Sequence, residues 1–397
     1  MMCYREDFTS RMFDRSRDLW DLFFGPNPDS EDVVRWTSQK FDSIQNGFIM
    51  RQTEGGPCGV LAPVQAFLIH KLVFQDGLGN IDELKNVSLE RFQSTLLCVL
   101  ETVLKRALPS PEFPVVWLQF SSQQNQFFSV DFVNMNEFTA LDFLASVAAS
   151  RTIDMVWSDM DDPSNTLIER FGHCSQETLN LMLFGRATSN AFDRDQPMGD
   201  TGLVLRGVPE EADIQIGLLS ELESLRYVTI GLKLKNPSFP IWIIGSQSHY
   251  TVLFSFDKSD CHVAPNERIR QFIASKFAQL QLDEGIMDSE NLNQLASLMH
   301  LAPPQFEDRT RLNQSGVVIL DDVLSWARPQ LQKKPEFADE QVRDLTRDYQ
   351  QLYFVNNQIS DHVYSVRIYR EGGTSCPDPV LPAILATRWP TQGIVFS

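Results

Sequence analysis

Cys58 stands between a glycine-rich turn and an apolar segment, a position that suits a nucleophile. The turn, Gly55-Gly56-Pro57, combines free backbone rotation with a fixed φ. Apolar residues then recur at helical spacing, at Leu61, Val64, Phe67 and Leu68. Because a helix N-terminus favours negative charge, this position predicts a lowered thiol pKa and more of the nucleophilic thiolate. The alternative is a tight turn with a buried cysteine.

His249 is the first candidate for the base that a thiol nucleophile needs. It stands at the start of residues 248–256, the strongest strand pattern in the chain, rich in β-branched and aromatic residues. His70 lies about three turns along the Cys58 helix and cannot reach the thiol. His362 opens another strand and is the rival. A purely structural histidine is the alternative for His249.

Gln52 precedes Cys58 across the glycine turn and is the candidate oxyanion donor. A side-chain amide there can donate to an oxyanion beside the Cys58 backbone N–H. Glu54 is nearer, but its charge is wrong for that role. Gly55 and Gly56 would let a substrate backbone approach closely, so both are candidate substrate-binding residues together with Glu54. The alternative for Gln52 is a solvated loop residue.

Length and charge narrow the classes of protein. The chain has 397 residues, enough for one large domain or two to three smaller ones. Its net charge of −18 argues against nucleic acid or an anionic membrane as a partner. The first residues carry charges and no apolar core, so we expect no signal peptide, and no apolar run reaches the roughly 20 residues of a membrane span. We expect a monomer in the cytoplasm, the nucleus or both.

The cysteines indicate neither a disulfide framework nor a metal site. They are dispersed, without a CxxC pair, and lie at Cys3, Cys58, Cys98, Cys174, Cys261 and Cys376. In a long chain without a secretion signal such cysteines are expected to be free thiols. Neither the cysteines nor the histidines fall at zinc-ligand spacing, so we expect no metal and no other cofactor.

Alternating helix and strand patterns predict a mixed fold. Besides the Cys58 helix, we expect a helix over residues 80–108, an amphipathic helix over 214–225, and strands over 227–234 and 239–245. Residues 154–162 have the composition of an acidic loop. Residues 185–196 are dense in polar side chains, which is typical of a surface loop and also of loops that line sites.

Residues 266–301 have the layout of an EF-hand: a helix, a glycine-containing loop and a second helix. With Gly285 at the sixth loop position, Leu280 and Leu282 occupy the first and third positions and Asn291 the twelfth. Calcium requires oxygen ligands at these positions and a closing glutamate. We therefore expect a degenerate EF-hand without calcium, and a short strand at 316–320 that pairs with the loop.

Several motifs together resemble the MINDY deubiquitinases, in the MINDY-3/4-like branch formerly called FAM188. They lie, in the expected order, at residues 52–68, 185–196, 205–207, 225–231, 240–252 and 387–390, with the degenerate helix–loop–helix among them. The resemblance covers nearly the whole chain. The Gly-Gly-Pro-Cys and Ser-x-x-His-x-Thr-Val motifs carry most of its specificity.

The resemblance implies an α+β fold with a papain-like cysteine peptidase core and an EF-hand-like insertion. The catalytic domain would comprise residues 1–265 and 302–397, with 266–301 inserted. The implied activity is thiol-dependent hydrolysis of isopeptide bonds in polyubiquitin, preferentially lysine-48-linked, with polyubiquitin chains and ubiquitinated proteins as partners. Cys58 would be the nucleophile, His249 the general base and Gln52 the oxyanion donor, while the residue that orients the histidine has no evident candidate.

Two other functions fit the sequence. One is a catalytically inactive ubiquitin-binding protein with the same fold. The other is a cysteine hydrolase that acts on a different acyl group.

Overall fold

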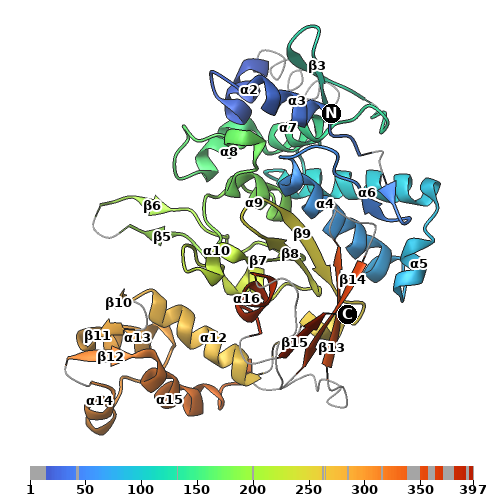
Figure 1. Ribbon diagram of the computed structural model, residues 1–397. Helices are drawn as coiled ribbons and strands as arrows, with labels where there is room; N and C mark the ends of the chain where they lie inside the picture. Colours follow the sequence, from blue (N-terminus) through green and yellow to red (C-terminus); the bar gives the residue numbers. More distant parts are fainter. Residues whose placement is uncertain are drawn as a thin grey trace. The chain divides into compact units, whose positions relative to one another are not determined.

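A computed structural model describes most of the chain, in two compact units. The described residues are 15–41, 44–131, 133–198, 201–261, 263, 265–283, 286–313, 316–337, 349–355, 363–369, 380–389 and 393–396. The first unit comprises Met1–Lys258 and Asp348–Ser397, and the second comprises Ser259–Arg347. The chain therefore leaves the first unit and returns to it, and each unit is described separately below (Figure 1).

The first unit contains a mixed sheet flanked by helices. The helices are α2 (Ser16–Phe24), α3 (Ser30–Ser38), α4 (Cys58–His70) with a π-helical extension (Lys71–Gln75), α5 (Ile81–Lys85), α6 (Leu89–Ala107), α7 (Ala140–Arg151), α8 (Ile153–Asp159), α9 (Gln176–Phe184), α10 (Glu221–Ser224), α11 (Leu232–Lys235) and α16 (Val380–Ala386), with a 3₁₀ turn at Arg170–Gly172. Many of them begin at a side-chain cap, such as the reciprocal Thr139–Asp142 capping box of α7.

The main sheet has six strands in the order β15-β14-β13-β9-β8-β7. They are β7 (Gly217–Ser220), β8 (Ile241–Gly245), β9 (Tyr250–Phe254), β13 (Tyr349–Val355), β14 (Val363–Tyr369) and β15 (Gly393–Phe396). Among the described strands of this sheet, β7 and β8 pair in parallel and the other neighbours are antiparallel. Three small hairpins complete the unit: β1 (Ile44–Gln45) with β2 (Ile49–Met50), β3 (Leu118–Ser121) with β4 (Gln126–Ser129), and β5 (Gln196–Pro197) with β6 (Val204–Leu205).

Strand β8 shows how the sheet separates two apolar layers. Ile241 and Ile243 belong to the core that contains α4, whereas Trp242 and Ile244 belong to the core that contains α16. Successive side chains of a strand point to opposite faces, so a fully apolar strand must be covered on both sides. Helices α4 and α16 therefore lie on opposite faces of the sheet.

Helix α4 is the centre of the first unit (Figure 1). All of its 13 residues are buried, and it packs against β8, β9, α6 and α9. The helix with its extension, Cys58–Gln75, is long and apolar enough by composition to cross a membrane, but 83% of it is buried inside the protein. A helix that is apolar on all sides is typical of a protein core, and we interpret α4 in this way.

Three expectations for local structure in this unit are wrong. Residues 214–225, expected as a helix, form β7 and the short α10, because β7 is buried beside the apolar β8. Within 227–234, the expected strand is replaced by the start of α11. The expected acidic loop at 154–162 largely forms α8, which buries Ile153 and Val156. The strands expected after residues 239 and 248 are confirmed as β8 and β9.

The second unit has its own core. It contains α12 (Pro265–Ala278), β10 (Gln281–Asp283), β11 (Ile286–Asp288), α13 (Leu292–Leu298), α14 (Phe306–Leu312), β12 (Val317–Ile319) and α15 (Leu320–Leu331), with 3₁₀ turns at Ser289–Asn291 and Pro335–Phe337. A further 3₁₀ turn, Lys258–Cys261, begins at the last residue of the first segment of the first unit. It is larger than the expected 266–301 insertion, because α14 and α15 contribute Leu312 and Trp326 to the same apolar cluster. The expected pairing of the 316–320 strand is confirmed by β11–β12, while Gly285 lies outside the described residues.

Candidate active site

The glycine turn places Cys58 at the first position of α4. The Cys58 N–H donates to the Gly56 carbonyl over 2.9 Å, and the Val60 and Leu61 N–H groups donate to the Pro57 carbonyl over 3.0 Å each. The Cys58 thiol lies 3.7 Å from the same Gly56 oxygen, and the residue is only 3% exposed. The local prediction of a turn, a cysteine and a helix is therefore confirmed.

Gly56 is held against a second turn, residues 169–174. Its φ is +116°, and a Cβ added to it would lie 2.6 Å from the Gly172 carbonyl oxygen. That oxygen accepts a hydrogen bond from Trp36 Nε1 over 2.9 Å, and the neighbouring Phe171 carbonyl accepts one from Arg35 over 2.8 Å. Only glycine combines this backbone conformation with so close an approach, so Gly56 has a structural reason to be glycine.

A second thiol, that of Cys174, lies beside the Cys58 turn. It donates to the Gly56 carbonyl over 3.6 Å, so both thiols contact one oxygen. A Cβ added to Gly59 would lie 2.7 Å from the Cys174 sulfur, which explains the glycine directly after Cys58. Sequence reasoning treated Cys174 only as a free thiol, and nothing in the spacing of the two cysteines pointed to this contact. None of the four described cysteines forms a disulfide.

The start of β9 reaches the Cys58 thiol. The Tyr250 backbone N–H interacts with the Cys58 sulfur, and the Tyr250 ring lies 3.5 Å from the position of a Gly59 Cβ. His249 immediately precedes Tyr250, and its carbonyl accepts hydrogen bonds from the Ser246 N–H and hydroxyl over 2.9 and 3.0 Å. The structure therefore brings the histidine expected as base into the segment that contacts Cys58. The rival His362 lies outside the described residues.

The thiol pKa differs from the sequence expectation. Burial raises the pKa of Cys58, while the N–H groups of Tyr250, Gly59 and Cys58 itself oppose this shift without cancelling it. The expected lowering was wrong because desolvation of the thiolate outweighs the field of the helix terminus. Burial and the nearby thiols of Cys58 and Cys174 also raise the pKa of the Tyr250 hydroxyl. The site thus holds neutral groups together in an apolar setting.

Gln52 is buried rather than solvated, with 6% exposure. Its Nε2 donates to the Glu54 carbonyl over 2.6 Å, and its Oε1 has no hydrogen-bond partner among the described residues. The amide donor expected for the oxyanion is therefore engaged by the backbone of its own loop. Glu54 is half-buried, and Gly55 is exposed with no atom within 4 Å of an added Cβ.

Two buried glutamines position the segment that leads to Cys58. Gln39 Oε1 accepts from the Thr53 N–H over 2.8 Å, and its Nε2 donates to the Arg51 carbonyl over 3.1 Å. Gln65, on α4, accepts from the Met50 N–H over 2.8 Å and donates to the Phe48 carbonyl over 3.0 Å. Sequence reasoning missed both residues. The one available signal was a polar side chain, Gln65, within an otherwise apolar helix.

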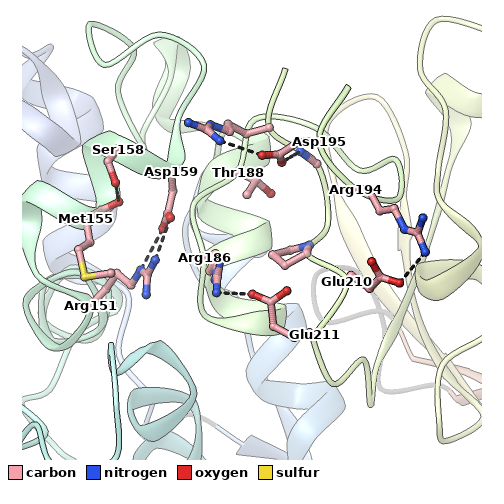
Figure 2. A pocket seen from close by; sticks show the side chains of 13 residues that line it. Arg151, Met155, Ser158, Asp159, Arg186, Thr188, Arg194, Asp195, Glu210 and Glu211 are labelled. Carbon is pink, nitrogen blue, oxygen red and sulfur yellow. Dashed lines mark hydrogen bonds and ion pairs between the residues drawn. The ribbon is translucent and has the colours of Figure 1, made fainter. Parts of the chain in front are cut away.

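The polar segment 185–196 lines a cavity of about 600 Å³ (Figure 2). Its arginines are paired with acids: Arg186 with Glu211, Arg194 with Glu210, and Arg206, on the facing segment, with Asp195. Arg151, buried at the same cavity, binds Asp159 through two hydrogen bonds of 2.8 and 3.0 Å. The segment is therefore a cavity wall whose cations are neutralised. Within the described residues, no group of three or more His, Cys, Asp or Glu side chains is arranged to hold a metal.

Comparison with known proteins decides the family. The model of the conserved domain of the deubiquitinating enzymes MINDY-3/4 matches residues 22–140 and 126–273, more than half of the chain. The chain belongs to the MINDY-3/4 family. The resemblance inferred from the motifs is thus confirmed, and with it the class of thiol-dependent deubiquitinases.

The MINDY-3 relatives match over most of their length, and a MINDY-4 relative matches over a third of its length. The ubiquitin carboxyl-terminal hydrolases MINDY-3 of Bos taurus and Homo sapiens are each 28% identical, over 96% of this chain and 97% of their own. The probable ubiquitin carboxyl-terminal hydrolase MINDY-4 of Bos taurus is 31% identical over 55% of this chain and 33% of its own. No solved structure matches the chain.

Proposed function

We propose that this MINDY-3/4 protein hydrolyses isopeptide bonds in polyubiquitin, with lysine-48-linked chains as the preferred substrate. The observation that carries the proposal is the meeting of the Cys58 turn with the start of β9, the strand preceded by His249. A papain-like core fits this arrangement, since a cysteine at the N-terminus of a central helix faces a mostly antiparallel sheet. Its partners would be polyubiquitin and ubiquitinated proteins. The protein would act as a monomer, in the cytoplasm, the nucleus or both.

The chemistry would proceed in two steps. The Cys58 thiolate attacks the carbonyl of ubiquitin's terminal glycine, and the leaving lysine amine takes a proton from His249, which leaves a thioester on Cys58. His249 then removes a proton from water, and hydroxide attack releases ubiquitin and the thiol. The Cys58 N–H and Gln52 Nε2 stabilise the oxyanion of each tetrahedral intermediate. Gln52 Nε2 can do so only after it leaves the Glu54 carbonyl, and the Cys58 N–H only after it leaves the Gly56 carbonyl.

His249 has an additional task in this scheme. Because burial raises the pKa of the Cys58 thiol, little thiolate exists near neutral pH without a base. Transfer of the thiol proton to His249 creates an ion pair in which the imidazolium stabilises the thiolate. The reaction therefore depends on the histidine before the attack as well as after it.

The burial of Cys58 also favours a second candidate, a ubiquitin-binding protein without turnover. A ubiquitin with an electrophilic C-terminus distinguishes the two. Labelling that is lost in Cys58→Ala and retained in Cys98→Ala, the matched exposed thiol, supports the hydrolase. A folded protein that binds ubiquitin but is never labelled supports the binding protein.

Turnover of lysine-48-linked tetraubiquitin then tests the individual residues. His249→Ala should abolish cleavage, whereas His362→Ala should retain most of it, and equal losses would refute His249 as the base. Gln52→Ala should lower kcat by about 10²–10³. A change below about twofold would remove Gln52 from the mechanism. Equal cleavage of lysine-48- and lysine-63-linked chains would refute the linkage preference.

A further inference from the structure

Phe171 occupies an unfavourable backbone conformation with its ring in solvent. Its φ is +64° and its ψ 18°, in the left-handed region, and its exposed fraction is 72%. Non-glycine residues avoid this region because Cβ crowds the backbone, and a phenylalanine lacks the short polar side chain with which asparagine offsets the strain. Neither folding nor core packing accounts for an aromatic residue at this position.

The turn around Phe171 is fixed rather than loose. Ile168 and Cys174 form an antiparallel bridge, and the Glu169 N–H donates to the His173 carbonyl over 2.7 Å. The Phe171 carbonyl accepts from Arg35 over 2.8 Å, and the next carbonyl, of Gly172, accepts from a buried tryptophan over 2.9 Å. These bonds hold the backbone in its strained conformation. The ring is thus presented to solvent from a rigid support.

This turn abuts the loop that leads to the nucleophile. The Gly172 carbonyl would lie 2.6 Å from a Cβ on Gly56, and the Gly56 carbonyl contacts the Cys58 thiol. Gly55, next in the loop, is exposed and has open space around it. The exposed Phe171 therefore directly precedes the residue that contacts the catalytic loop, and Gly55 in that loop is exposed. Strained residues that persist at such places often serve function.

We propose that Phe171 is a specificity-determining residue that packs against the C-terminal tail of the ubiquitin under attack. The inference rests on the proposed function and names a contact of that site. The tail is narrow and ends in two glycines, so flat peptide groups without side chains approach the nucleophile. An aromatic ring provides a large apolar face for such a peptide and loses little conformational entropy on binding.

Phe171→Asn separates this role from a structural one. Asparagine tolerates the left-handed region, so the variant should unfold at the same temperature as wild type or a higher one. Labelling by ubiquitin with an electrophilic C-terminus should lose about tenfold in second-order rate constant, through weaker binding rather than a lower saturating rate. Phe171→Tyr should retain the wild-type rate. Phe306→Asn, which alters an 83% exposed phenylalanine in the second unit, is the matched control and should be unchanged.

Each other outcome has a defined meaning. Equal labelling of wild type and Phe171→Asn overturns the inference. Normal labelling with slower cleavage of tetraubiquitin overturns the tail assignment and moves the contact to the ubiquitin that carries the lysine. If Phe171→Asn unfolds at a lower temperature, the strain argument is wrong. The labelling rate of Phe171→Gly then shows whether Phe171 contacts the ubiquitin tail, since a wild-type rate overturns the inference and a loss of about tenfold supports it. Absent labelling of folded wild type refutes the proposed function instead.

Discussion

Replacement of Gly56 by alanine should damage the site, whereas the same change at Gly55 should not. An added Cβ at position 56 lies 2.6 Å from the Gly172 carbonyl oxygen, against 3.4 Å for an ordinary contact, so the backbones must separate by about 0.8 Å. The φ of +116° adds strain of about 1–3 kcal/mol for a residue with a Cβ. Together these effects should lower the free energy of unfolding by about 2–4 kcal/mol.

The catalytic effect follows from what the Gly56 carbonyl contacts. It accepts the Cys58 N–H and lies beside the Cys58 thiol, so a shift of the loop moves the proposed nucleophile and one proposed oxyanion donor together. Displacement of a catalytic group by about 1 Å can cost about 10² in rate. Gly56→Ala should therefore lower the rate of labelling by electrophilic ubiquitin by about 10- to 100-fold. The assay is run well below the unfolding temperature, so that folded protein is compared.

Gly55→Ala is the matched control. Its φ lies outside the left-handed region, it is exposed, and nothing lies within 4 Å of the added Cβ. The free energy of unfolding in urea should change by less than about 0.5 kcal/mol, and the rate of labelling should stay within a factor of about three of the wild-type rate. Equal effects at the two positions, or wild-type behaviour of Gly56→Ala, would refute the role assigned to the contact between the two turns.

Two further predictions concern stability. Burial is the main reason why the pKa of His70 is lowered from 6.5 to about 4, so folding favours the neutral imidazole. The resulting stabilisation is present above pH 6.5 and is lost as the pH falls toward 4. Between pH 7.5 and 5, the free energy of unfolding of the wild type, measured in urea, should fall by about 2 kcal/mol more than that of His70→Leu. The same pH dependence in both proteins would contradict this prediction. Asp159→Asn should cost about 3–5 kcal/mol because it leaves the buried Arg151 without its carboxylate. Glu210→Gln, in the exposed pair with Arg194, should cost under about 1 kcal/mol, and similar losses in the two variants would refute the argument from burial.

Those parts of the fold with strong local patterns could be predicted from the sequence. The alternation and the composition of the β9 residues both indicate a strand. In α4, a turn signal is followed by a long apolar run, which indicates a helix. The helix predicted for residues 214–225 was wrong because their apolar spacing fits a helix as well as a buried strand. Pairing of β7 with the apolar β8 decides between them, and that partner is distant in the sequence. Tertiary pairing overrides local propensity at such places.

In the candidate site, too, local motifs could be predicted from the sequence, whereas contacts between distant segments could not. Cys58 and His249 stand in recognisable motifs, so residue type and order were sufficient to select them. Gln39 and Cys174 act through contacts with the backbone of residues 51–56, which no spacing along the chain encodes. Gln52 was selected because its side-chain amide can donate to an oxyanion, but its engagement with the Glu54 carbonyl depends on the folded loop.

The opposing effects on Cys58 change how its reactivity is explained. A cysteine at a helix N-terminus is expected to ionise easily, yet here burial prevails over three N–H groups and raises the thiol pKa. In the proposed mechanism the helix terminus contributes a donor for the oxyanion and a fixed direction for the sulfur, while ionisation comes from the histidine. In such a site the thiol stays protonated and unreactive until a base is aligned with it. In the proposed mechanism, proton transfer to His249, and not the helix dipole, is the step that makes the nucleophile.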